Sequence, residues 1–128
     1  MVFVFGSNEK GIHGGGAART AVARYGAVWG QGEGRQGNAY AIPTCSAPMR
    51  SDGDRLPLPK VREYVHRFVQ YAKGHPEEKF KVTQVGCGLA GLAAVDVAPM
   101  FEDAPRNCYF DLAWEGFLPH HLFWGTFG

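Results

Sequence analysis

The sequence predicts an α/β fold built around a largely parallel sheet. Two observations lead to this prediction. Short apolar runs alternate along the chain with stretches that suit helices, and the two most glycine-rich turns each follow an apolar run. Strands that alternate with helices are typical of layered α/β proteins. The 128 residues match the size of one domain.

The first third of the chain shows the alternation clearly. Residues 2–5 form a continuous run of β-branched and aromatic side chains, which suits a strand buried on both faces. Residues 17–25 are expected to form a short helix that a glycine ends. Residues 30–37 are expected to form a glycine-rich loop, and residues 38–43 a strand that a proline stops.

The strongest helix signal in the chain lies over residues 60–73. Apolar side chains recur there every three to four residues, which predicts an amphipathic helix with one buried face. The other expectations are a surface loop over 44–59, strands over 80–85 and 107–112, a helix over 92–101 that Pro99 shortens or kinks, and an irregular aromatic tail over 113–128.

Composition narrows the class of protein. The formal net charge of +1 makes nucleic acid an unlikely partner on electrostatic grounds. The chain contains no stretch of about 18 apolar residues, so we expect no membrane span. The first residues lack the basic region of a signal peptide. The three cysteines are widely spaced, so neither a disulfide framework nor a zinc site is expected. We therefore expect a cytoplasmic protein without a metal or cofactor.

Two glycine-rich turns hold the main functional signal. The first runs from Phe5-Gly6-Ser7-Asn8 into three successive glycines at 14–16, and the second spans residues 84–91. Each follows a predicted strand and precedes a predicted helix. Bare backbone N–H groups at a helix N-terminus suit an anion such as phosphate. Ligands in such folds bind beyond the carboxyl ends of strands, so a ligand with two phosphates, or with a phosphate and a sugar, is expected.

The order of these motifs resembles the macrodomain superfamily, and especially a compact phage-related group within it. A strand, Gly-x-Asn, a glycine triplet, a small-residue helix, and then a later strand with Gly-Cys-Gly follow one another over about residues 1–112. The Gly-Cys-Gly-Leu element is similar to the branch that removes terminal ADP-ribose from protein carboxylates. The resemblance implies a three-layer α/β/α domain over 1–112, shortened at its N-terminus. The aromatic extension over 113–128 would pack on the same domain.

The resemblance also implies a ligand, ADP-ribose or an ADP-ribosylated substrate, and a set of contacts. Asn8 would meet the distal ribose, the glycine triplet would approach that ribose and the phosphates, and the second loop would wrap the diphosphate. If the chain is an enzyme, the expected reaction is hydrolysis at C1″ of that ribose, with Asn8 and His13 as catalytic candidates. The predicted ligand-binding residues are Gly6, Ser7, Asn8, Gly14, Gly15, Gly16, Ala17, Gly86, Cys87, Gly88, Leu89, Ala90 and Gly91.

Three departures from the macrodomain pattern favour binding over catalysis. Positions that hold an aspartate or lysine in the hydrolytic branches are Ala18, Ala90 and Cys45 in this chain. No familiar catalytic side chain therefore transfers, and no aspartate for adenine can be assigned. A non-catalytic sensor or sponge for a nucleotide derivative is an open alternative.

Several further alternatives remain open. One of them is a structural module that self-associates through its aromatic tail. Cys45 is either a nucleophile or a small buried residue, and Cys87 is expected to pack under its loop. Glu33 either activates a water or is solvated. The Gly30-x-Gly32-x-Gly34 motif either lines the ligand or forms a surface turn.

Overall fold

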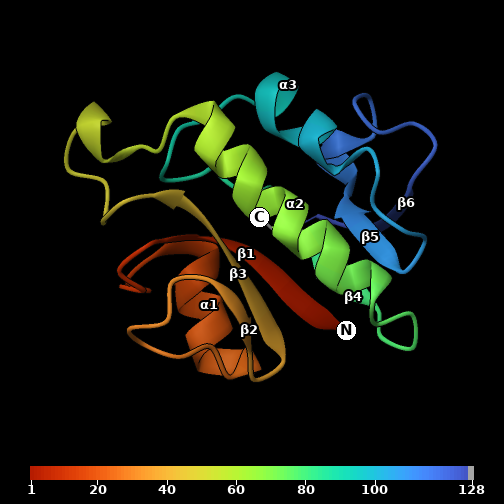
Figure 1. The fold of residues 1–128 in the computed structure, drawn as a ribbon, viewed down its shortest axis with the longest axis horizontal. Helices are drawn as coiled ribbons and strands as arrows, with labels where there is room; N and C mark the ends of the chain where they lie inside the picture. The colour runs from red at the N-terminus through yellow and green to blue at the C-terminus, as the bar shows by residue number, and fades with distance from the viewer. Residues whose placement is uncertain (127–128) are drawn as a thin grey trace.

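A computed structural model describes residues 1–126 as one six-stranded sheet flanked by helices (Figure 1). The strands are β1 Val2–Asn8, β2 Gly34–Gln36, β3 Ala39–Cys45, β4 Phe80–Val82, β5 Cys108–Asp111 and β6 Leu122–Gly125. The α-helices are α1 Gly16–Tyr25, α2 Leu58–Lys73 and α3 Ala94–Val97, and short 3-10 helices are η1 Asp52–Asp54, η2 Ala98–Phe101 and η3 Leu112–Trp114.

The sheet is mixed and mostly parallel, as predicted. Its strand order is β2-β3-β1-β4-β5-β6, and only β2 runs antiparallel to its neighbour. β3 continues through Pro43 to Cys45, whereas the sequence predicted a strand that ends at this proline. On the side of β3 that faces β2, the pairing covers only residues 39–41. The nitrogen of Pro43 therefore has no partner strand on that side that would need an N–H donor.

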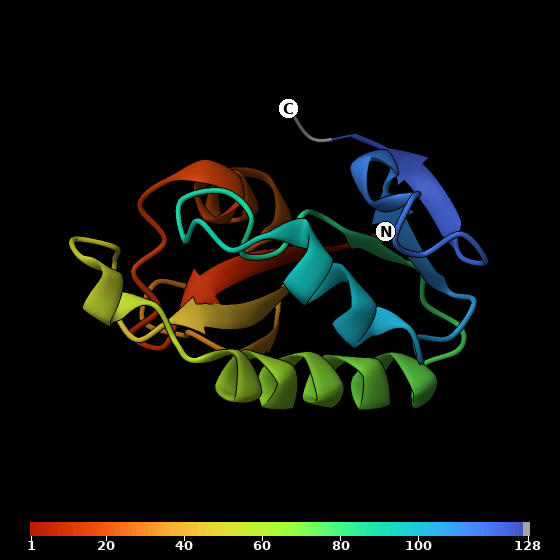
Figure 2. The same ribbon diagram turned by 90° about the horizontal axis from the view of Figure 1, so that it is seen from above.

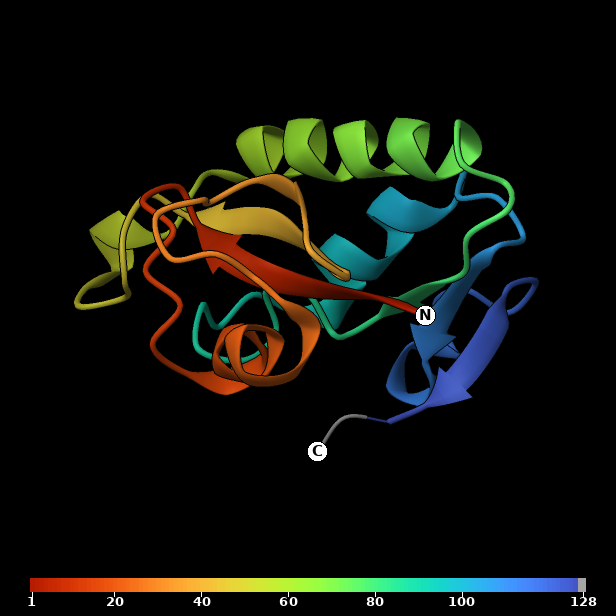
Figure 3. The same cartoon turned by 90° about the horizontal axis from the view of Figure 1, so that it is seen from below.

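Alternating side chains of β1 divide the interior into two cores. Val2 and Val4 pack with the apolar face of α2, whereas Phe3 and Phe5 pack with α1 on the opposite side of the sheet. Figures 2 and 3 show α1 and α2 on opposite sides. The predicted apolar face of α2 is confirmed. The residues of this face are all buried: Val61, Tyr64, Val65, Phe68, Val69 and Ala72.

The helix predicted over residues 92–101 is short and interrupted. α3 has four residues and passes directly into η2, with Pro99 at the start of the tighter turn. Proline cannot donate the helical hydrogen bond, which explains the change of geometry. Phe101 of η2 packs against Phe68 of α2, with ring centroids 6.1 Å apart, so this segment lies on the same face as α2.

The prediction of an irregular tail was wrong. Residues 112–125 contain η3 and then β6, which extends the sheet beside β5. Trp114 and Leu118 are fully buried in the larger core, so this segment belongs to the same packed unit. Residues 127 and 128 of the predicted extension, including Phe127, lie outside the described part of the chain. The loop predicted over 30–37 likewise contains the short strand β2.

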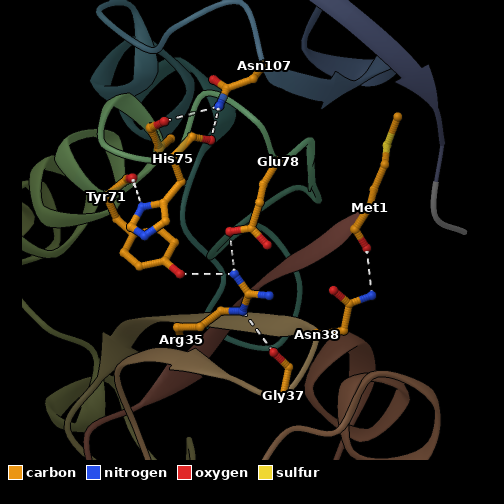
Figure 4. A network of polar contacts seen from close by, with 9 residues as sticks. Met1, Arg35, Gly37, Asn38, Tyr71, His75, Glu78 and Asn107 are labelled. Carbon is orange, nitrogen blue, oxygen red and sulfur yellow. Dashed lines mark hydrogen bonds and ion pairs between the residues drawn. The ribbon is translucent and has the colours of Figure 1, made fainter.

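A polar network ties the edge strand β2 to the end of α2 (Figure 4). Nη1 of Arg35 donates to Oε2 of Glu78 at 2.7 Å and to the hydroxyl of Tyr71 at 2.9 Å. This ion pair lowers the pKa of Glu78. Nearby, Asn107 donates to the carbonyls of Ala72 and His75. The network lies near the amino ends of β3, β4 and β5, so it stabilises that end of the sheet.

Candidate functional site

A cleft opens beyond the carboxyl ends of the central strands. The chain leaves β1 toward α1 on one face of the sheet, and leaves the neighbouring strand β4 toward α3 and η2 on the other face. Loops that diverge from adjacent parallel strands in this way leave a crevice between them. The cleft has a volume of about 590 Å³ and lies between the two glycine-rich loops.

The two glycine loops contact one another although they are far apart in sequence. A Cβ at Gly6 would lie 3.0 Å from the backbone nitrogen of Gly86, so the two main chains approach too closely for a side chain to fit easily. A Cβ at Gly15 would lie 3.1 Å from Cδ1 of Leu89. Leu89 therefore reaches from the second loop to the first while 74% of it remains exposed.

The first loop presents free backbone donors at the start of α1. The N-cap residue is Gly15, so no side chain accepts a hydrogen bond from the N–H groups of the first turn. That turn holds no acidic residue. The first N–H groups of a helix have no intrahelical acceptor, and the helix dipole gives this end a partial positive charge. Gly14, Gly15, Gly16, Ala17 and Ala18 all line the cleft.

Some carbonyls of the second loop accept N–H groups from within the loop, and three successive amides remain free. Leu92 donates its N–H to Gly86, and Gly91 donates its N–H to Gly88. In the described part of the chain, the backbone N–H groups of Gly88, Leu89 and Ala90 have no protein acceptor. These three residues line the cleft opposite the first loop. Both walls therefore carry donors that suit an anion.

Asn8 shapes the first loop. Its Nδ2 donates to the Ile12 carbonyl at 2.9 Å, and its Oδ1 accepts from the Ile12 N–H at 3.1 Å. Each end of the carboxamide retains capacity for one further hydrogen bond. Ser7 donates its hydroxyl to the Gly32 carbonyl, so it braces the loop from behind. Both residues line the cleft.

No ionised side chain lines the cleft within residues 1–126. The lining contains no Asp, Glu, Lys, Arg or His; its titratable groups are the thiols of Cys45 and Cys87. Burial raises the pKa of both thiols, so they are neutral at physiological pH. Cys45 is buried, which confirms the interpretation of a small buried residue. The cleft thus combines neutral walls with backbone donors.

Two predicted site residues do not line the cleft. His13 was a catalytic candidate, but it is 1% exposed, with its ring packed edge-on against Phe5. Its Nε2 hydrogen-bonds the Gln31 carbonyl at 3.0 Å, so it fixes the loop backbone instead of meeting a ligand. Gly91 also lies outside the lining, and its N–H is bonded to Gly88.

The loop over residues 30–37 supports the first glycine loop and takes no part in the lining. A Cβ at Gly32 would lie 2.4 Å from the Asn8 carbonyl oxygen, so glycine is required by this crossing of two backbones. The Glu33 carboxylate pairs with Arg67 at 3.3 Å, at the exposed surface. Neither the Gly30-x-Gly32-x-Gly34 motif nor Glu33 therefore contributes to the cleft.

Part of the lining was missed by the sequence reasoning. Thr44 is the last residue but one of β3, and Thr83 follows β4 directly, so their position at strand ends was a usable signal. The segment Ala47-Pro48-Met49 gives no such signal, since it reaches the cleft only because the chain turns back after β3. The lining residues outside the predicted set are Ile12, Ala18, Thr44, Cys45, Ala47, Pro48, Met49, Thr83 and Gln84.

No family model matches this chain, and neither a curated protein nor a solved structure matches it. Within the described residues, no group of three or more His, Cys, Asp or Glu side chains is arranged to hold a metal ion. In the same part of the chain, no helix has the length and apolarity needed to cross a membrane.

Proposed function

We propose that this chain is a macrodomain-like module that binds ADP-ribose, or a related phosphorylated ribose, between its two glycine loops. The observation that carries the proposal is the convergence of backbone donors from residues 14–18 and 88–90 on one cleft without a carboxylate. An anion there meets donors from both sides and no negative charge. The volume of about 590 Å³ suits a small organic ligand.

The energetics favour a charged ligand over a neutral one. A hydrogen bond to a charged group contributes about 1.5–3 kcal/mol, roughly twice the value for a neutral pair. Four such bonds to a pyrophosphate would give about 6–12 kcal/mol before the cost of immobilising the ligand, which is about 4 kcal/mol or more. The upper part of the remaining range, about 5.5–8 kcal/mol, corresponds to dissociation constants of about 1–100 µM, which is the affinity that we expect.

Binding without turnover is the better supported form of this function. Hydrolysis of a ribosyl bond benefits from a positioned acid or base, and the described lining offers none that titrates near neutral pH. With His13 bonded to the loop backbone, Asn8 is the remaining catalytic candidate, and it acts by orientation alone. We accordingly propose a sensor or sponge for an NAD-derived nucleotide. The three cysteines are free thiols, which fits the proposed cytoplasmic location.

Self-association through the tail is less well supported. Trp114 and Leu118, the central residues of the aromatic segment, are used in the core. Leu112 is 50% exposed and Phe117 is 38% exposed, so two large apolar side chains of η3 and its flanking turn remain at the surface, which is a small patch for a partner.

Titration calorimetry with ADP-ribose tests the proposal directly. AMP and ribose 5-phosphate serve as partial ligands, and adenosine as a control without phosphate. We expect ADP-ribose to bind most tightly and adenosine to give no measurable heat. An ADP-ribosylated protein substrate should release no ADP-ribose after prolonged incubation. Absence of ADP-ribose binding at about 1 mM ligand, a free energy weaker than about −4 kcal/mol, would overturn the proposal.

A further inference from the structure

Arg55 lies behind the second glycine loop and contacts it directly. Its Nε donates to the carbonyl oxygen of Ala90 at 2.7 Å. A Cβ at Gly91 would lie 3.2 Å from Nη2 of Arg55, so the guanidinium packs against the main chain of this turn. Arg55 is outside the cleft lining, but Ala90 is part of it.

The backbone around Arg55 is held in place by the end of β3. Arg55 forms an isolated antiparallel bridge with Cys45, and Leu56 donates its N–H to the Thr44 carbonyl at 2.9 Å. Nη2 of Arg55 also lies 3.4 Å from Oδ1 of Asp52. The side chain is only 30% exposed. Its guanidinium is therefore presented to the loop from a fixed position.

The carbonyl that Arg55 binds receives no hydrogen bond from the second loop itself. The Gly86 and Gly88 carbonyls accept N–H groups from within the same turn, whereas the Ala90 carbonyl accepts only from the guanidinium. Gly91 has φ +71°, a conformation in which glycine permits the preceding peptide to rotate at low cost. Rotation of that peptide would turn the Ala90 carbonyl toward the anion and break the hydrogen bond from the Gly91 N–H to the Gly88 carbonyl, which holds the turn with its free amides in place.

We propose that Arg55 is a positioning residue for the anion site: it fixes the Ala90–Gly91 peptide and places a permanent positive charge behind the second loop. The inference rests on the proposed function, because it assigns Arg55 a role in binding the same phosphate-bearing ligand. The guanidinium does not touch the ligand; it acts through the carbonyl of Ala90. No cation lines the cleft within the described residues, so this charge acts from outside the lining.

Two measurements on the intact chain test this inference separately from the ligand assignment. The first is the dissociation constant for ADP-ribose. The second is the rate at which iodoacetamide alkylates Cys87 without ligand, followed by peptide mass spectrometry. Cys87 lies within the same loop and is half-buried, so its alkylation reports loop opening.

Four variants are compared with the parent chain. Arg55→Met removes the hydrogen bond and the charge. Arg55→Gln removes the charge and the two Nη groups but keeps a donor near the position of Nε, and Arg55→Lys keeps the charge with a single donor group. Arg50→Met is the matched control, because Arg50 is exposed on the same segment and its side chain makes no contact with the loop.

We expect Arg55→Met to weaken ADP-ribose binding at least about tenfold, as for a lost hydrogen bond with a charged partner. In this variant, iodoacetamide should alkylate Cys87 several-fold faster than in the parent chain, while the unfolding temperature changes little. Arg55→Gln and Arg55→Lys should fall between Arg55→Met and the parent chain, and Arg50→Met should match the parent chain. Parent-like binding and alkylation in Arg55→Met would overturn the inference. If the parent chain binds no ADP-ribose yet Arg55→Met still exposes Cys87, the proposed ligand is wrong while the positioning role stands.

Discussion

Gly88→Val is the sharpest perturbation of the proposed anion site. A Cβ at Gly88 meets no atom within 4 Å, and Gly88 is not among the glycines with positive φ. The folded chain can therefore accept the side chain without strain, and the loss of glycine's flexibility in the unfolded state stabilises the protein by up to about 1 kcal/mol. Gly86 is unsuitable for the same test, since its φ is +78° and a Cβ there would lie 2.9 Å from Leu92.

The effect on binding follows from the space that the valine occupies. A phosphate oxygen bound to these amides must come to about 2.9 Å from their nitrogens, and a branched side chain on the same residue obstructs that approach. Loss of two charge-assisted hydrogen bonds corresponds to about 3–6 kcal/mol. At about 1.4 kcal/mol for each tenfold change, the affinity for ADP-ribose should fall by more than about 100-fold.

Calorimetry with ADP-ribose measures this loss, and thermal unfolding verifies the fold. Gly116→Val is the matched control, because Gly116 also has open space around its Cβ position and ordinary φ, but lies outside the cleft. Gly14→Val applies the same test to the first loop, where a Cβ again meets nothing within 4 Å. If Gly88→Val and Gly14→Val bind within threefold of the parent chain, the two loops do not hold the phosphates.

Three other predictions concern the framework of the site. Asn8→Ala should lower the free energy of unfolding by about 1–3 kcal/mol, since its two loop hydrogen bonds are lost, and urea denaturation measures it. Trp114→Ala should cost about 3–5 kcal/mol in the same assay, while Phe117→Ala at the surface should cost about 1 kcal/mol or less; equal effects would contradict the buried role of the indole. Burial raises the pKa of Cys108 from 9.0 to about 12. The folded state thus holds this proton more tightly, so the free energy of unfolding should fall as the pH rises from about 9 to 12. The fall should be less steep in Cys108→Ala. If the free energy of unfolding of the two chains fell equally steeply with pH, the burial assigned to this thiol would be wrong.

The elements that the sequence predicts well are those whose signal is local. The apolar run of β1 and the three- to four-residue spacing of α2 each point to one structure without reference to the rest of the chain. β6 was missed because its four half-buried residues show no clear alternation. Its place depends on distant contacts, such as the hydrogen bond from Nε1 of Trp124 to the Val82 carbonyl.

The candidate site was also predictable only where its signal is local. Glycine-rich turns after apolar runs are visible in the sequence, but their meeting depends on strand order, which puts β1 beside β4 with loops leaving toward opposite faces. His13 was expected to face a ligand because it is a polar residue in a loop, whereas in the structure Phe5 and the Gln31 carbonyl enclose it. Arg55 gave no signal, since its contact with Ala90 joins separate parts of the chain.

A crystal structure of the chain with ADP-ribose tests the central claim most directly. We predict that pyrophosphate oxygens lie at hydrogen-bond distance, about 2.7–3.2 Å, from backbone nitrogens of both residues 14–18 and residues 88–90. A ligand held by one loop alone, or bound away from the cleft, would contradict the account.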